Sequence, residues 1–187
     1  PQPWSTMLPS SQAEIDAKRQ SLINLIWGPG GMTKGSPDVE TTPDGFVVRQ
    51  PYGINSRVKY TPGNAQCLVV YHGGHINPGA AHDVPAHANC GLLEFDMPLY
   101  GGNPRPYVTT RHGYYRLVNH DLLATLPLNV HPLRLFLDPV NQVLNRVAPH
   151  YRTIIMMGHS GGGWATTLYA ALDTRIRISI PMAGSLP

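Results

Sequence analysis

The most informative segment of the chain is residues 151–173, Y-R-T-I-I-M-M-G-H-S-G-G-G-W-A-T-T-L-Y-A-A-L-D. Its apolar run Thr153–Met157 is typical of a strand buried on both faces of a parallel sheet. Apolar residues then recur at helical spacing over Gly161–Leu172, which predicts a helix. Between the two, residues 158–162 form a G-x-S-x-G pattern, which is meaningful only where a strand precedes it and a helix follows. The segment therefore predicts a sharp strand-to-helix turn with Ser160 at its tip.

Ser160 is the candidate nucleophile of this turn. A strand and a helix that close on each other so sharply leave no room for Cβ atoms, which explains Gly158 and Gly162. The serine Oγ is then expected at the carboxyl end of the sheet, beside a helix N-terminus that favours negative charge. A glycine-rich turn with an incidental serine is the alternative. The turn directs the side chain of His159 elsewhere, so we expect it to pack or to line a pocket.

A second glycine-rich turn follows an apolar run and reads H-G-G-H from His72 onward. Acyl transfer passes through a tetrahedral oxyanion, which needs N–H donors. One donor is expected at the backbone N–H of Gly161, directly after the serine, and the other at Gly73 or Gly74. We expect His72 to brace this loop; a flexible turn after a strand is the alternative.

Metal-ligating residue types are concentrated around this second turn. They are His72, His75, His82, Asp83 and His87. Imidazole and carboxylate groups suit zinc, but H-G-G-H is not the H-E-x-x-H pattern that places two histidines on one helix face. We therefore expect no metal and no organic cofactor. His72, His75 and His159 are instead candidates for the wall of a substrate pocket, and His82 and His87 for its loop or substrate side.

Further apolar runs predict the rest of a sheet. The candidate strands are Phe46–Arg49, Ser56–Tyr60, Gln66–Tyr71, Leu92–Pro98 and Ile176–Ile180. Helical spacing runs from Leu133 to Val147, with Pro139 either kinking that helix or following an N-cap at Asp138. This alternation predicts an α/β fold with a mostly parallel central sheet and helices on both faces.

The sequence pattern of the N-terminal part of the chain differs from that of the rest. Ser11 and Glu14 form a capping box at the head of a helix, and glycines from Gly28 onward end it. Residues 32–45 are rich in Gly, Pro, Asp and Thr and are expected to form a loop. We therefore divide the chain into an N-terminal helical and loop extension, 1–45, and a second part, 46–187.

Composition excludes several classes of protein. The chain has 187 residues, 42% of them hydrophobic and 13% charged, which fits one ordered domain. The net charge of +3 is spread without a basic run, and no stretch approaches the ~20 apolar residues of a membrane span, so neither nucleic acid nor a bilayer is an expected partner. Cys67 and Cys90 are either paired or free thiols. The start without Met and the low charge favour an extracellular or periplasmic location, although the sequence does not fix the compartment.

Taken together, four motifs resemble those of the α/β-hydrolase family. They are H-G-G at 72–74, D-M-P-L-Y-G at 96–101, G-H-S-G-G at 158–162 and P-M-A-G at 181–184. The resemblance covers residues 46–187 and implies a serine hydrolase with a Ser-His-acid mechanism acting on a small-molecule acyl substrate. The G-H-S-G-G form is more similar to esterases and lipases than to peptidases, which favours a carboxylic ester; a peptidase or amide hydrolase is the alternative within the family.

The family's chain order is serine, acid, histidine, and the last two are missing here. Asp173 is the only acidic residue after Ser160, at the end of the expected helix, and no histidine follows the serine. We therefore expect the chain to be the N-terminal part of a larger enzyme, ending after the strand that follows the nucleophile helix. The C-terminal remainder beyond Pro187 is then the expected partner that supplies acid and base, and its absence leaves an unpaired sheet edge.

Two alternatives remain open from the sequence. In the first, an upstream histidine serves as the base. The candidates are His82, His87, His112 and His120. In the second, the chain is a binding or scaffolding protein that keeps the fold without catalysis, because fold alone does not fix function.

Overall fold

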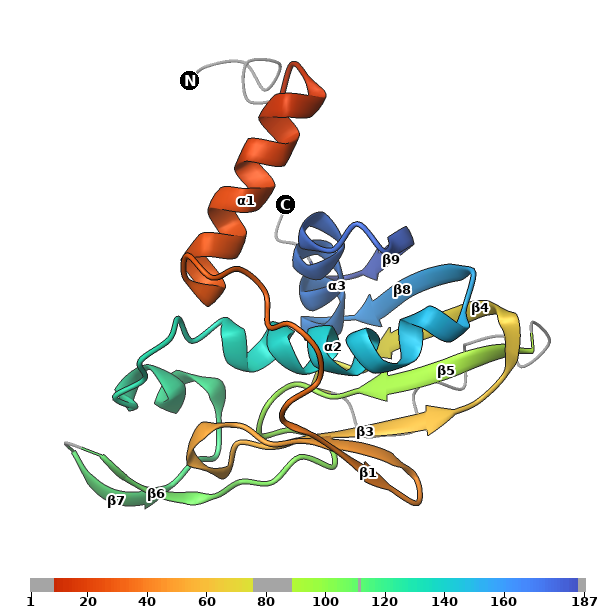
Figure 1. Ribbon diagram of the computed structural model, residues 1–187. Coiled ribbons are helices and arrows are strands. Elements are labelled where there is room, and N and C mark those ends of the chain that lie inside the picture. The colour runs from red at the N-terminus through yellow and green to blue at the C-terminus, as the bar shows by residue number, and fades with distance from the viewer. Residues whose placement is uncertain (1–8, 76–88, 111, 185–187) are drawn as a thin grey trace.

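The computed structural model describes residues 9–75, 89–110 and 112–184, and its centre is a seven-stranded sheet (Figure 1). Its strands, in spatial order, are β1 (Val39–Thr42), β2 (Gly45–Val48), β3 (Ser56–Thr61), β5 (Cys90–Phe95), β4 (Asn64–His72), β8 (Thr153–His159) and β9 (Ile176–Met182). The four strands β5, β4, β8 and β9 run parallel to one another, whereas β1, β2 and β3 join one another and β5 through antiparallel pairings. The expected mostly parallel sheet is thus confirmed.

The register brings the two glycine-rich turns to one edge of the sheet. On β4, His72 pairs with Phe95 on one side and with Gly158 on the other. Because parallel strands share their carboxyl edge, the H-G-G turn and the serine turn leave the sheet side by side. Neighbours in this sheet come from distant parts of the sequence, since β5 lies between β3 and β4.

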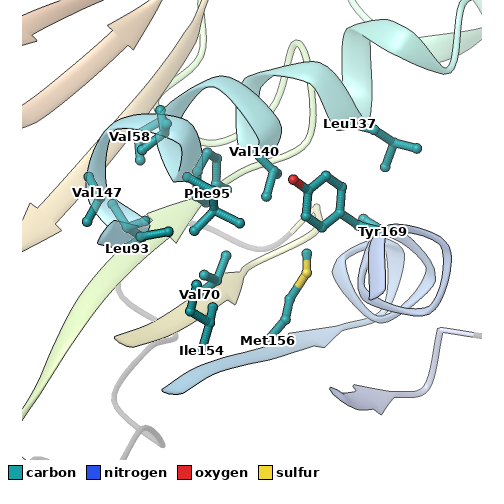
Figure 2. Close-up of a cluster of buried hydrophobic side chains, with 14 of the residues drawn as sticks. Val58, Val70, Leu93, Phe95, Leu137, Val140, Val147, Ile154, Met156 and Tyr169 are labelled. Atoms are coloured by element: carbon teal, nitrogen blue, oxygen red, sulfur yellow. The ribbon is translucent and has the colours of Figure 1, made fainter. Parts of the chain in front are cut away.

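The helices are α1 (Gln12–Trp27), α2 (Arg134–Val147) and α3 (Gly161–Leu172). All three contribute to one core cluster against one face of the sheet, and no α-helix covers the other face within the described residues. Figure 2 shows the centre of this core, where Val70 and Met156 of the sheet face Val140 of α2 and Tyr169 of α3. Packing of α2 and α3 against β4 and β8 fixes the base of the serine turn.

Helix α2 begins at Arg134 and continues through Pro139, so the alternative in which it starts after an N-cap at Asp138 is wrong. Asp138 is instead a buried hydrogen-bond acceptor. Its Oδ1 accepts from Trp27 Nε1 at 2.7 Å, and its Oδ2 accepts from Gln142 Nε2 at 3.1 Å. This carboxylate ties the end of α1 to α2, which compensates for burying its charge.

The loop expected over residues 32–45 contains a strand, which corrects that expectation. Val39–Thr42 forms β1 and pairs antiparallel with β2 through a tight turn at Pro43 and Asp44. The N-cap half of the capping box is confirmed, because Ser11 Oγ accepts from the N–H of Glu14 at 3.2 Å, whereas the Glu14 carboxylate accepts from the N–H of Ser10 and not of Ser11. The extension therefore adds one strand and one helix to the sheet and core, while the boundary at residue 45 stays a prediction.

A smaller layer lies beside the N-terminal end of α2. It contains the two-stranded sheet of β6 (Tyr107–Thr110) and β7 (Gly113–Arg116), and the short 3₁₀ helix η5 (His120–Thr125). Its buried side chains form a second core that includes Leu99, Val108 and Leu135. Two more single-turn 3₁₀ helices, η2 (Pro51–Gly53) and η6 (Ala148–His150), complete the described helices.

Cys67 and Cys90 form a disulfide between the neighbouring strands β4 and β5, with Cα atoms 4.8 Å apart. This settles the alternative that the sequence left open. Disulfides are typical of proteins in oxidising compartments. Across the described ranges, no helix is both long and apolar enough to cross a membrane.

Candidate active site

Ser160 occupies the turn between β8 and α3 in a conformation that L-residues rarely adopt. Its φ of 55° and ψ of −124° lie outside the allowed regions for a residue with a side chain. The N–H of Ser160 donates to the carbonyl of Met182 at 2.9 Å, and its own carbonyl accepts from Trp164 at 3.1 Å. Strain of this kind persists only where the surroundings hold it, and it is concentrated at functional sites.

The glycines around Ser160 are required by close packing. A Cβ on Gly158 would lie 2.7 Å from Thr166 Oγ1, and a Cβ on Gly162 would overlap the carbonyl of His72. On Gly163 a Cβ would lie 2.5 Å from the carbonyl oxygen of Met182. These positions accept no side chain because the obstacles are mostly backbone atoms that cannot rotate away.

The loop after β4 lies directly against the serine turn. Gly74 has a φ of +67°, and a Cβ there would lie 2.6 Å from the carbonyl oxygen of His159 and 2.7 Å from the nitrogen of Gly162. The N–H of Gly73 is already used inside the sheet, where it donates to Phe95 at 2.7 Å. The N–H of Gly74 donates to Nδ1 of His72 at a longer 3.3 Å.

His72 lies behind this loop, where its ring stacks on Phe95. Its burial, and then the nearby imidazoles of His75 and His120, lower the pKa of His72 to about 4. The ring is therefore neutral near pH 7, so Nδ1 is available to accept the N–H of Gly74. This environment suits a brace for the loop and not a base exposed to substrate.

His75 is the histidine that reaches the nucleophile helix. A Cβ on Gly161 would lie 2.8 Å from His75 Cε1 and 2.7 Å from the terminal methyl of Met97. His75 packs edge-on against Tyr100, with ring centroids 4.5 Å apart, and lies 5.1 Å from His120. These side chains come from the loops that follow β4 and β5 and from η5, so they converge only in the folded chain.

A chain of ring contacts continues from His75 along the site. We call it the aromatic cluster, and its members are His75, Tyr100, His120, Phe136 and Trp164. The Nε2 of His120 donates to the carbonyl of Pro98 at 2.6 Å. Burial lowers the pKa of His120, against the opposing effect of that hydrogen bond. His159, in contrast, is half-buried, and its Nδ1 has no hydrogen-bond partner among the described residues.

The D-M-P-L-Y-G motif forms the loop that follows β5, at the carboxyl edge of the sheet. The N–H of Gly102 donates to Oδ2 of Asp96 at 3.2 Å, and a Cβ on Gly101 would overlap that carboxyl group. Burial raises the pKa of Asp96. The motif thus wraps the loop after β5 around one carboxyl and delivers Met97 to Gly161.

Asp173 is committed to structure at the far end of α3. It accepts from Tyr169 at 2.6 Å and from Arg175 Nη2 at 2.6 Å. Burial alone would raise the pKa of Asp173, but the hydrogen bonds from Arg175 and Tyr169 outweigh it and lower that pKa. This agrees with the expectation that Asp173 is not a triad acid.

The remaining candidates are one described histidine and three residues outside the described ranges. His112 lies in the turn between β6 and β7, while His82, Asp83 and His87 lie outside the described residues. Among the residues that the structure describes, no group of three His, Cys, Asp or Glu side chains could hold a metal ion. A cavity of about 740 Å³ opens along β2, β3 and β5, but Ser160 does not line it.

Two solved structures share this arrangement of sheet, turn and helix. Acetyl xylan esterase 1 from Thermoanaerobacterium sp. JW/SL YS485 superposes with a TM-score of 0.55 at 18% identity, over 94% of this chain and 61% of that one. The acetyl xylan esterase from Paenibacillus sp. R4 gives 0.50 at 20% identity, over 96% of this chain and 64% of that one.

The chain has the α/β-hydrolase fold. The chain spans somewhat less than two thirds of the length of the two structures that it matches. No protein-family model matches its sequence, and no curated protein does. At such identities the likeness carries the fold alone, so the chemistry has to be argued from the residues.

Proposed function

We propose that this chain carries the nucleophile half of a serine hydrolase that cleaves carboxylic esters. The observation that supports this most strongly is the backbone of Ser160, held in a left-handed conformation between a buried strand and a helix N-terminus. Glycine adopts this backbone conformation without steric strain, whereas serine does not. A serine without a role is therefore not expected at this position of a glycine-rich turn.

In the proposed reaction, Ser160 Oγ attacks the carbonyl carbon of the ester and forms a tetrahedral oxyanion. The N–H of Gly161 is in the first turn of α3, where helix geometry leaves it without an intrahelical partner, so it can donate to that oxyanion. Gly74 is the better second donor, because the N–H of Gly73 is already bonded within the sheet and that of Gly74 makes only a long bond to His72.

A histidine must take the serine proton and pass it to the leaving alcohol, and water must then release the acid. We assign this histidine and its acid to polypeptide outside this chain. The partial length relative to the matched structures and the open edge of β9 support this assignment. On that edge, Ile178 and Ile180 are 48% and 42% exposed, as expected for a strand that is covered in the whole protein.

The printed names of the two matched structures, both acetyl xylan esterases, favour an ester over an amide. We assign His75 and Met97 to the pocket wall, because both side chains lie directly against Gly161. The mechanism needs no metal or organic cofactor, because its oxyanion is stabilised by backbone donors.

Fluorophosphonate labelling with mass mapping tests the nucleophile, with p-nitrophenyl acetate turnover measured in parallel. We expect a phosphonate adduct on Ser160 that is abolished in Ser160→Ala and retained in Ser179→Ala, a matched exposed serine on β9. The same labelling is repeated on the longer natural chain, where the acid and base are supplied. Absence of labelling in both contradicts the proposal, and turnover that survives Ser160→Ala but stops with a chelator indicates a metal hydrolase.

A further inference from the structure

The outer face of the β6–β7 hairpin carries exposed side chains that the proposed chemistry does not use. Tyr107 pairs with Arg116 and Thr109 with Tyr114, so alternation along the strands places these four on one face. The opposite face is buried through Val108 in the second core. We call this exposed set the hairpin platform.

Two tyrosines dominate the hairpin platform. Tyr107 and Tyr114 are 61% and 70% exposed, and their rings stack with centroids 5.5 Å apart and an interplanar angle of 22°. Together they form a contiguous apolar surface, and contiguous apolar patches on a protein surface are often functional. Each ring keeps an outward side on which the apolar face of a pyranose ring can stack.

The formally charged side chains in the segment that contains the hairpin are all positive. Between Met97 and His120 the sequence contains three arginines and no aspartate or glutamate. On the platform itself, Arg116 is exposed beside Tyr107, and its Nε donates to the carbonyl of Arg105 at 3.2 Å. That bond fixes the direction of the side chain and leaves the two terminal nitrogens for a planar, bidentate partner such as a carboxylate.

The size of the platform argues against a protein partner. From their exposed fractions, the two tyrosines offer roughly 250–300 Å² of surface, whereas a stable protein interface buries about 800 Å² per partner. Nucleic acid fits poorly as well, because its affinity depends on several neutralised phosphates. One oriented guanidinium beside two stacked rings matches a sugar ring that bears one carboxylate.

A series of contacts connects the platform to the serine turn. Arg105, which accepts the bond from Arg116, places its guanidinium 5.7 Å above the ring of Tyr100. Tyr100 packs against His75, which lies against Gly161. Figure 1 shows the hairpin projecting beyond the edge of the sheet toward which the arrowheads of β5 and β8 point, which is the edge that bears Ser160.

The geometry points to the hairpin platform as a binding site for a polysaccharide that bears uronic acids, next to the site of ester cleavage. This rests on the proposed function for its biological sense, because it makes the substrate an ester carried on or beside an acidic glycan. Binding to the platform requires no chemistry, so the two ideas are separable by experiment.

Native affinity electrophoresis of the full chain through gels containing polygalacturonate tests the inference, with dextran as the neutral comparison. We expect retardation by polygalacturonate that weakens with added salt. Arg116→Gln should raise the apparent dissociation constant about tenfold, and Tyr107→Ala or Tyr114→Ala at least fivefold. Tyr114→Phe should keep most of the binding, because the ring remains.

The matched control is Arg152→Gln, which removes the same charge from an exposed position before β8, at the opposite edge of the sheet. It should leave retardation unchanged, and circular dichroism verifies that each variant is folded. Absence of retardation, or retardation that all platform variants retain, overturns the inference. Tighter binding to poly(U) through the same residues overturns it too, in favour of nucleic acid.

Failure of the proposed function gives a different result. The inactive variant Ser160→Ala should be retarded like the unchanged protein. Retardation without any reaction of Ser160 supports glycan binding by the hairpin platform and contradicts the proposed hydrolase activity. Labelling of Ser160 without retardation supports the hydrolase activity and contradicts glycan binding by the platform.

Discussion

Replacing Gly74 by alanine tests how the two glycine-rich turns depend on each other. The φ of +67° costs an alanine about 1–2 kcal/mol. The new Cβ would also lie 2.6 Å from the carbonyl oxygen of His159 and 2.7 Å from the nitrogen of Gly162. Both obstacles are backbone atoms, so the loop has to move, at a further cost of about 1–3 kcal/mol. Gly74→Ala should therefore lower the free energy of unfolding by about 2–5 kcal/mol.

The same movement takes the proposed second oxyanion donor away from Ser160. Loss of one such donor slows acyl transfer by about 10²–10³ fold. We expect the rate of fluorophosphonate labelling of Ser160 to fall by a similar factor under conditions where the variant remains folded. Urea denaturation followed by circular dichroism gives the stability, and the labelling rate gives the effect on the site.

Gly35→Ala is the matched control. Gly35 has the same φ of +67°, but a Cβ there would meet nothing within 4 Å. It therefore carries the backbone strain without the overlap, and should cost only the same strain of about 1–2 kcal/mol. If Gly74→Ala and Gly35→Ala prove equally destabilising and Ser160 reacts normally in both, the close approach of the two turns is refuted.

Three further predictions concern the scaffold of the site. Replacing Cys67 and Cys90 by serine removes a cross-link between residues 23 apart in sequence, and loop-closure entropy then predicts a loss of about 3.4 kcal/mol in urea denaturation; a reducing agent should produce the same loss in the unchanged chain. The pKa of about 4 for buried His72 means that the unfolded chain takes up a proton below the ordinary value of 6.5 while the folded chain does not. The free energy of unfolding should thus fall by up to about 3 kcal/mol between pH 6.5 and 4, and the slope should flatten in His72→Asn. Tyr169→Phe removes the 2.6 Å hydrogen bond to Asp173 and should cost about 1–2 kcal/mol in the same assay.

The strand-to-helix turn could be predicted from sequence because every part of it is local. The apolar run, the glycines and the helical spacing are contiguous, and the structure places β8 and α3 where the pattern indicates. The strand β1 was missed although its signal was present. The Pro43-Asp44 turn, followed by Gly45 and flanked by two short β-branched runs, is a turn signal, and the composition of residues 32–45 concealed it.

The aromatic cluster could not be predicted in the same way. Its members come from the loops after β4 and β5, from η5, from α2 and from α3, and no periodicity in the sequence relates them. The choice between Gly73 and Gly74 was also beyond the sequence. It depends on which N–H the sheet uses, and the pairing of β4 with β5 decides that by giving the N–H of Gly73 to Phe95.

The serine turn is held entirely by elements of this chain. The N–H of Ser160 is fixed by Met182 of β9, the carbonyl of Ser160 is fixed by Trp164 of α3, and Gly74 closes the turn from β4. None of these restraints requires the histidine or the acid of a triad. Preorganised donors can stabilise an oxyanion without a base, which is why enzymes that lose their triad keep a residual rate. The proposed nucleophile and its proposed oxyanion donors are therefore held in place together, and under this proposal whatever supplies the base has only to deliver an imidazole to a serine that is already in position.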